Sequence, residues 1–301
     1  MRRSRLIAVL LVVTIVVLGI ALTFSLISGS TGGGGRVQTG RVEFQNGEVK
    51  LAGNLFIPAG EGPFPAVVVI HGSAAETSRD MLMHGWFFVQ HGFAVLTYDK
   101  RGVGESGGSY ERVLAKNSDS VFEDLAGDAL AGVELLKNHD QIDPNRIGLF
   151  GGSQAGWIVV LAASKSSDVA FIASFVGPVC TVGQEYFYSG TTGAGPGDKI
   201  EGISLKQASD MARDFAGPHG FDPLPLLEAM DIPGLWMFGG QDRSTPTVLS
   251  VENLDALVAQ YGKDFSYIIY PNADHNMKTD TQQIHPFMID ALDWMVERFG
   301  D

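Results

Sequence analysis

The 301-residue chain is acidic and rich in apolar residues, which narrows the classes of protein it can belong to. Hydrophobic residues make up 45% and charged residues 18%, so a large folded core is expected and a disordered or collagen-like chain is excluded. The net charge of −13 disfavours nucleic acid as a partner, because such binding depends on neutralising phosphates. The single cysteine, Cys180, excludes an intrachain disulfide and a cysteine-based zinc site.

The N-terminus carries a long apolar segment from Leu6 to Ile27, preceded by Arg2, Arg3 and Arg5. As a helix, these 22 residues would span about 33 Å, which matches a bilayer core of about 30 Å. Residues 1–27 are therefore expected to be a transmembrane helix that anchors the protein, with a cleaved signal peptide as the alternative. The arginines should stay in the cytoplasm, so the remaining chain is expected outside it, membrane-anchored or secreted.

A linker and a hairpin follow. Residues 28–40 are rich in Gly and Ser and are predicted to form a flexible linker. The segments Arg41–Phe44 and Val49–Ile57 flank Asn46-Gly47, a dipeptide that favours a tight hairpin because both turn positions need positive φ. The folded domain is therefore expected to cover residues 41–301 and to begin with an antiparallel pair.

Compact apolar segments then alternate with helical patterns. The predicted strands are Ala66–Ile70, Ala94–Tyr98, Ile147–Phe150, Phe171–Phe175, Gly234–Phe238 and Phe265–Tyr270. The predicted helices are Met81–His91, Ser120–Asn138, Ser153–Ser164, Thr247–Tyr261 and His285–Phe299. This alternation predicts a mostly parallel, doubly wound α/β sheet. The connection between Phe175 and Gly234 is longer than one crossover needs, so residues 177–232 are predicted to form a small cap.

The segment Gly151-Gly152-Ser153-Gln154-Ala155-Gly156 lies between a predicted strand and a predicted helix. It is a near match to G-x-S-x-G, in which a sharp turn exposes the serine hydroxyl and the residues two positions away must be small. Ala155 replaces the second glycine, and Gly156 should keep the helix close to its neighbours. The simpler alternative is a Gly-Ser sequence that only begins a helix. The pattern favours Ser153 as a nucleophile.

A nucleophilic serine needs a base, and the base needs an acid that orients it. Asp242 and His275 each follow a predicted strand, as Ser153 does. Because the carboxyl ends of parallel strands are where ligands bind, the three residues are expected to form a Ser-His-Asp triad. Asp274 is the competing acid, but adjacent residues rarely orient one another's rings, so Asp242 is preferred.

An oxyanion hole needs two donors aimed at the developing charge. The candidates are the N–H of Gln154 and the N–H of Ser73 in the loop after Ala66–Ile70, where His71 is expected to brace the loop. The aromatic run Tyr186, Phe187 and Tyr188 lies in the predicted cap and is a candidate lining for the substrate pocket, or else part of the cap's own packing.

Two other kinds of site are disfavoured. Gly102–Gly107 contains G-x-G-x-x-G, but no apolar helix begins there, so a structural loop is expected in which Asp99 and Arg101 form hydrogen bonds or an ion pair. The remaining histidines lack the spacing of metal ligands, so no metal site is predicted.

These motifs together resemble the α/β-hydrolase superfamily, and in particular bacterial serine esterases and prolyl-oligopeptidase-like or dienelactone-hydrolase-like members. The resemblance covers about Arg41 to Phe299 and rests on the hairpin, His71-Gly72, Asp99–Ser106, Gly151–Gly156 and the segments around Asp242 and His275. It implies an α/β-hydrolase fold with Ser153 as nucleophile, Asp242 as acid and His275 as base. Dienelactone hydrolases generally use cysteine, so Ser153 disfavours that activity.

The sequence therefore predicts a serine hydrolase that cleaves small-molecule carboxylic esters through an acyl-enzyme, without a cofactor. The first rival is a serine peptidase or amidase of the prolyl oligopeptidase type. Such enzymes usually carry a large N-terminal propeller, and here about 40 residues precede the first predicted strand. The second rival is a non-catalytic binding protein of the same fold, although such proteins usually lack a triad residue and all three are present here.

Overall fold

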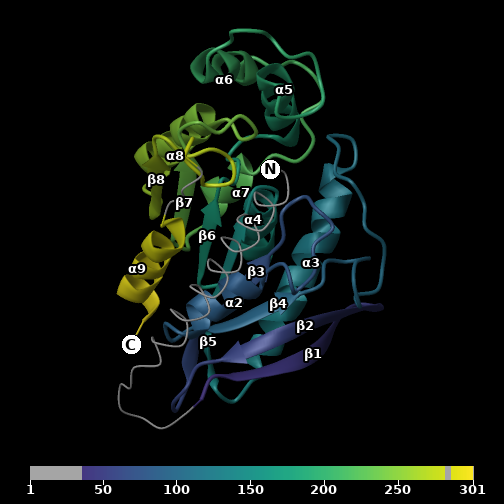
Figure 1. Ribbon diagram of the computed structural model, residues 1–301, viewed down its shortest axis with the longest axis vertical. Coiled ribbons are helices and arrows are strands. Elements are labelled where there is room, and N and C mark those ends of the chain that lie inside the picture. Colours follow the sequence, from purple (N-terminus) through teal and green to yellow (C-terminus); the bar gives the residue numbers. More distant parts are fainter. Residues whose placement is uncertain (1–35, 282–285, 301) are drawn as a thin grey trace, which may run out of the picture. The chain divides into compact units, whose positions relative to one another are not determined.

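An eight-stranded sheet runs through residues 36–281 and 286–300, the part of the chain that the computed structural model describes (Figure 1). The strand order is β1-β2-β4-β3-β5-β6-β7-β8, with β1 and β2 antiparallel to their neighbours and all other pairs parallel. The strands are β1 (Gln38–Asn46), β2 (Val49–Ile57), β3 (Phe64–Ile70), β4 (Ala94–Tyr98), β5 (Ile142–Gly152), β6 (Phe171–Phe175), β7 (Gly234–Gly239) and β8 (Phe265–Tyr270). The predicted hairpin and mostly parallel sheet are confirmed.

Three strands begin earlier than the sequence pattern predicts, and one of them is β3, which starts at Phe64 instead of Ala66. β1 starts at Gln38, inside the segment expected to be a linker. β5 starts at Ile142, five residues before the predicted Ile147, because its first half is polar and partly exposed and so lacks the apolar signal of a buried strand. The predicted bounds of β4, β6 and β8 agree with the structure.

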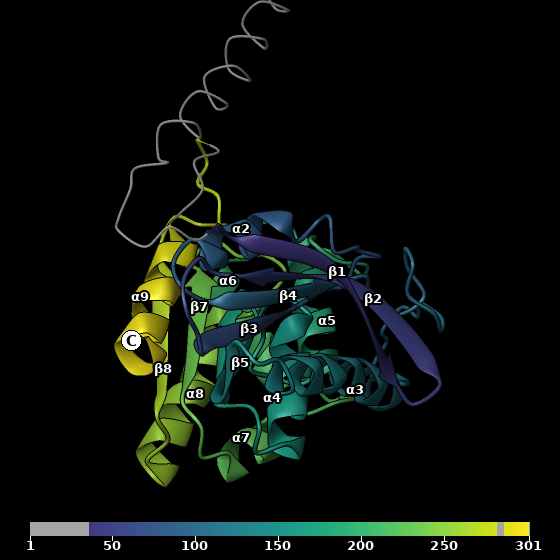
Figure 2. The same cartoon turned by 90° about the horizontal axis from the view of Figure 1, so that it is seen from below.

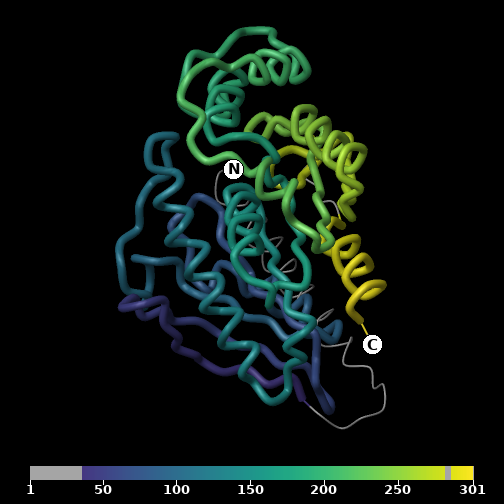
Figure 3. The backbone as a smooth tube through the Cα atoms, turned by 180° about the vertical axis from the view of Figure 1, so that it is seen from behind, coloured from purple at the N-terminus to yellow at the C-terminus, as the bar shows by residue number. Residues whose placement is uncertain are grey.

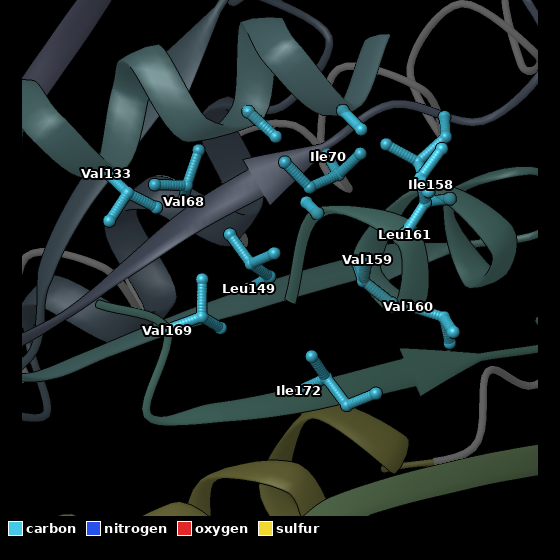
Figure 4. Packing of buried hydrophobic residues seen from close by; sticks show 14 of the residues in the cluster. Val68, Ile70, Val133, Leu149, Ile158, Val159, Val160, Leu161, Val169 and Ile172 are labelled. Carbon is cyan, nitrogen blue, oxygen red and sulfur yellow. The ribbon is translucent and has the colours of Figure 1, made fainter. Parts of the chain in front are cut away.

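Helices cover both faces of the sheet (Figure 2). One face carries α3 (Ser118–Lys137), α4 (Ala155–Lys165), α7 (Leu224–Ala229) and α8 (Thr247–Tyr261), and the other carries α2 (Leu82–Val89) and α9 (Phe287–Phe299). Successive strand residues point into opposite cores. Val68 and Leu149 pack with α3 and α4 (Figure 4), whereas Val67 and Phe150 pack with α2 on the other face. This double burial explains why the strands lack polar alternation.

The long connection between β6 and β7 does not form a single cap. Helices α5 (Val182–Thr192) and α6 (Leu205–Arg213) pack on each other beyond the end of the sheet, and α6 also contacts α8 (Figure 3). The third helix, α7, packs instead against α4 and α8 in the helical layer. The predicted cap of residues 177–232 is therefore corrected to a cap made of α5, α6 and their loops.

A buried ion pair holds the loop after β4 against α3. Arg101 Nε and Nη2 donate to the two carboxylate oxygens of Asp128 at 2.9 and 2.6 Å, and Asn46 Nδ2 donates to the same carboxylate at 2.9 Å. Asp99 does not pair with Arg101; its carboxylate accepts the backbone N–H groups of Ser78 and Glu105. The loop that contains G-x-G-x-x-G is thus a structural element.

The expected membrane anchor, Leu6–Ile27, lies outside the described residues. Within residues 36–281 and 286–300, no helix combines the length and apolar character needed to cross a membrane.

Candidate active site

Ser153 occupies a strained turn between β5 and α4. Its φ is 56°, a left-handed conformation that a non-glycine residue seldom adopts, and its N–H donates to the carbonyl oxygen of Phe175 at 3.0 Å. The turn ends the central strand and starts α4 two residues later. The side chain is thereby presented at the carboxyl edge of the sheet, as the sequence pattern predicts.

The small residues around Ser153 are required by close packing. A Cβ added to Gly151 would lie 2.6 Å from both Ala155 Cβ and the carbonyl oxygen of Ile70. A Cβ on Gly156 would lie 2.6 Å from Gly177 Cα, so this glycine allows α4 to approach the chain after β6. Ala155 is tolerated because Gly151 leaves room for its methyl group.

His275 links Ser153 to a buried carboxylate. His275 Nε2 lies 3.0 Å from Ser153 Oγ, and His275 Nδ1 lies 2.9 Å from Asp242 Oδ2. The other carboxylate oxygen of Asp242 accepts the N–H groups of Ser244 and Thr245 at 2.7 and 2.9 Å. Because every acceptor faces a donor, the carboxylate is held in one orientation and fixes the imidazole. The structure therefore brings together the three residues predicted from the ends of β5, β7 and β8.

Asp274, the competing acid, has a different set of contacts. Its Oδ1 accepts the backbone N–H groups of Asn276 and Lys278 at 2.8 and 3.0 Å, which closes the turn after His275. It makes no hydrogen bond to the His275 ring in the described structure.

Burial lowers the pKa of His275, but the hydrogen bond and charge of Asp242 outweigh this effect and raise the pKa above its usual value.

Ser73 and Gln154, which carry the two predicted oxyanion donors, line the same cavity. Ser153 lines that cavity too, and the amides of Ser73 and Gln154 donate to no other residue within the described ranges. His71, expected to brace this loop, donates from Nε2 to the carbonyl oxygen of Tyr98 at 2.5 Å. Burial lowers the pKa of His71 to about 4, so its ring is neutral at pH 7, and it also packs edge-on against the Tyr98 ring.

The cavity next to Ser153 has a volume of about 390 Å³. It lies between the sheet edge, the loop that follows β4 and the cap helix α5. Its walls include His275, Trp157 from α4, and Arg112. The Arg112 guanidinium donates to Tyr186 Oη at 3.3 Å. A space of this size can hold a small ester beside the serine.

Only one of the three aromatic residues expected to line the pocket does so. Tyr186 faces the cavity, but Phe187 packs on Phe215 of the cap with ring centroids 5.2 Å apart. Tyr188 is buried behind the site, where its hydroxyl donates to the carbonyl oxygen of Asp242 at 2.7 Å. Consecutive residues of a helix point about 100° apart, so three in a row cannot share one lining face.

Glu185 was not among the predicted site residues, yet it lines the cavity. Ser244 Oγ lies 3.4 Å from Glu185 Oε1, and the Glu185 carboxylate, when it is ionised, raises the pKa of His275. Burial raises the pKa of Glu185 to about 8, so the carboxyl is protonated at neutral pH. The spacing of Val182, Glu185, Tyr186 and Ser189 marks one face of α5, and this periodicity was the available signal.

No group of three or more His, Cys, Asp or Glu side chains in the described ranges is arranged to hold a metal ion.

The arrangement of a strained serine, a histidine and a buried carboxylate on an eight-stranded α/β sheet is that of an α/β-hydrolase-superfamily serine hydrolase. Residues 82–301 match the prolyl oligopeptidase family, to which the chain belongs.

The chain is similar in sequence to proteins that are named for different activities, an esterase and a peptidase among them. It is 25% identical over 214 residues to the esterase EstD of Thermotoga maritima, covering 64% of this chain and 50% of that protein. It is 27% identical over 242 residues to the uncharacterized peptidase YuxL of Bacillus subtilis, covering 76% and 34%. The chain thus spans half or less of these two relatives. Among solved structures, an esterase of Pyrococcus furiosus aligns with a TM-score of 0.63 at 18% identity, covering 88% and 92%, which shows the shared fold.

Proposed function

We propose that the protein hydrolyses carboxylic esters through an acyl-enzyme formed on Ser153. The observation that carries the proposal is the continuous hydrogen-bonded chain from Asp242 through His275 to Ser153 Oγ at the wall of a cavity. Asp242 Oδ2 accepts a hydrogen bond from the Nδ1–H of His275, which keeps the ring proton on Nδ1 and leaves the lone pair of Nε2 free to act as the base. This is the tautomer that general-base catalysis requires.

The reaction proceeds in two stages, formation of the acyl-enzyme and its hydrolysis by water. Ser153 Oγ attacks the ester carbonyl carbon while His275 Nε2 takes the hydroxyl proton, and the negative charge on the carbonyl oxygen is stabilised by the amides of Ser73 and Gln154. When the intermediate collapses, the carbon–oxygen bond to the alcohol breaks and His275 protonates the leaving alkoxide. Water then attacks the acyl group in the same way, releasing the carboxylic acid and restoring Ser153.

Esters are favoured as substrates by the names of several relatives, but a second candidate has its own support. EstD is named an esterase, whereas YuxL and the prolyl oligopeptidase family are named for peptide hydrolysis. The same triad can cleave either bond. A panel of unactivated alkyl acyl esters and peptidyl amides of a fluorescent amine, with each kcat/KM divided by the uncatalysed hydrolysis rate constant of the same substrate, should show the larger ratio for the esters. A larger ratio for the amides would instead favour the peptidase.

The nucleophile is tested by Ser153→Ala, with Ser189→Ala as the matched control. Loss of a triad nucleophile should lower kcat for a 4-nitrophenyl ester by about 10⁶. Ser189 lines the same cavity but donates to the carbonyl oxygen of Tyr186, so its replacement should have little effect on kcat. Activity of Ser153→Ala within tenfold of the wild type would contradict the assignment.

A further inference from the structure

Lys100 is a buried cation next to the candidate oxyanion hole. It follows β4 and is only 2% exposed. Its Nζ donates to the carbonyl oxygens of Gly72 and Ala74 at 2.6 and 3.3 Å, and to the side-chain oxygen of Gln154 at 3.2 Å. One ammonium group thus joins the loop on either side of Ser73 to the residue that follows the nucleophile.

The bond to Gly72 has a consequence for Ser73. The carbonyl of Gly72 and the N–H of Ser73 belong to the same planar trans peptide, so they point in opposite directions. Because Lys100 holds the Gly72 oxygen, the Ser73 N–H points away from Lys100. Ser73 lines the cavity that contains Ser153 and His275, and its amide has no other acceptor in the described ranges.

The neighbouring groups of this loop are held as well. Gly72 N–H donates to Glu76 Oε2 at 3.1 Å, and the carbonyl oxygen of Ser73 accepts from Tyr110 Oη at 2.6 Å. The Gly72 N–H, the Gly72 carbonyl and the Ser73 carbonyl therefore all have partners within the protein, and the Ser73 N–H is the backbone group that remains for a ligand. A peptide that begins with glycine reorients easily, so it needs such restraints to stay in one orientation.

Lys100 keeps its charge under ordinary conditions. Burial lowers its pKa to about 8, and the nearby Glu76 offsets part of this effect, so the ammonium form predominates at pH 7. The Tyr110 ring centroid lies 5.4 Å from Nζ, within the range of a cation–π contact. A buried ammonium held by three oxygens is a rigid attachment point for the loop.

We propose that Lys100 is a positioning residue. Its bond to the Gly72 carbonyl locks the Gly72–Ser73 peptide so that the Ser73 N–H faces the oxyanion. Its bond to the side-chain oxygen of Gln154 ties the loop that carries Ser73 to the residue that carries the second donor, the Gln154 N–H. The proposal rests on the proposed esterase function. Lys100 acts through these two amides and does not touch the reacting atoms.

The test replaces Lys100 with Met, whose unbranched side chain matches that of Lys as far as Cε but lacks the ammonium group and its donors. Removing an oxyanion donor outright costs about 10²–10³ in kcat, so releasing one should lower kcat by about 10- to 100-fold with KM little changed. Affinity for a trifluoromethyl ketone, which forms a charged tetrahedral adduct on the serine, should fall by the same factor. Lys137→Met, at a surface lysine bonded to Asp168, is the matched control and should change neither quantity.

A purely structural role would lower the melting temperature without this paired loss. The proposal is overturned if Lys100→Met keeps the wild-type kcat, or if kcat falls while ketone affinity stays at the wild-type value. If Lys100→Met does not fold, Lys100→Gln supplies the same comparison with an uncharged donor and should show a smaller paired loss. A wild-type protein that neither turns over esters nor binds the ketone would refute the proposed function itself.

Discussion

Replacing Asp242 by Asn should impair catalysis through the tautomer of His275. The Asp242 carboxylate accepts two backbone N–H groups at Oδ1 and His275 Nδ1 at Oδ2. In an asparagine, the amide oxygen must face the two N–H donors, so the NH₂ group must face Nδ1. Nδ1 then becomes an acceptor and the ring proton moves to Nε2, where it blocks removal of the Ser153 proton.

The magnitude follows from this wrong tautomer. A fall in kcat of about 10⁴ is expected, which corresponds to about 5.4 kcal/mol at about 1.36 kcal/mol per tenfold change. The pH profile should change too. Burial lowers the pKa of His275 while Asp242 raises it, so loss of the carboxylate should lower this pKa and move the acidic limb of the residual activity to lower pH.

The assay is kcat/KM for a 4-nitrophenyl ester between about pH 5 and pH 9. Asp274→Asn is the matched control, because an amide oxygen can still accept the two backbone N–H groups that Asp274 holds. This variant should retain most of the wild-type activity. The reasoning is refuted if Asp274→Asn causes the larger loss, or if Asp242→Asn remains within tenfold of the wild type.

Three further outcomes are expected. Because burial raises the pKa of Glu185 to about 8, Glu185→Gln should abolish any inflection of kcat/KM near pH 8 and change the rate at pH 6 little; a persisting inflection would assign it to another group. Asp128→Ala removes the buried carboxylate that accepts two Arg101 hydrogen bonds and leaves Arg101 only its contacts with Asp124, so it should lower the free energy of unfolding by up to about 3–5 kcal/mol in urea titrations, whereas Asp168→Ala at a surface pair should cost below about 1 kcal/mol. If the N-terminal segment anchors the protein, full-length chain should resist carbonate extraction and deletion of residues 1–35 should release an active enzyme; extraction of the full-length chain would contradict the anchor.

The alternation of strands and helices along the chain and the members of the hydrogen-bonded triad could be predicted because their signals are local. Ser153, Asp242 and His275 each follow a compact apolar strand, and parallel strands bring their carboxyl ends to one edge. The choice of Asp242 over Asp274 rested on a geometric rule about adjacent residues. The contacts of the two side chains agree with that rule.

Other features depend on contacts between distant residues and had no local signal. Lys100 gives no sign in the sequence that its ammonium is buried, because its three acceptors lie 26 to 54 positions away. The choice between pocket lining and cap packing for Tyr186, Phe187 and Tyr188 could not be made from the sequence, because a helix turns neighbouring residues to different sides and only Tyr186 faces the cavity. The division of the inserted segment depends on packing between α7 and α4, which apolar patterns alone do not specify.

The central claim, that Ser153 is an activated nucleophile, is tested most directly by covalent labelling. A fluorophosphonate probe requires the serine oxygen to displace fluoride from phosphorus, and this needs both the base and the oxyanion donors. Incubation followed by peptide mass spectrometry should find one equivalent of the probe on Ser153, and labelling should disappear in His275→Ala. An unlabelled protein, or a probe attached to another residue, would contradict the account and favour a binding protein built on the same fold.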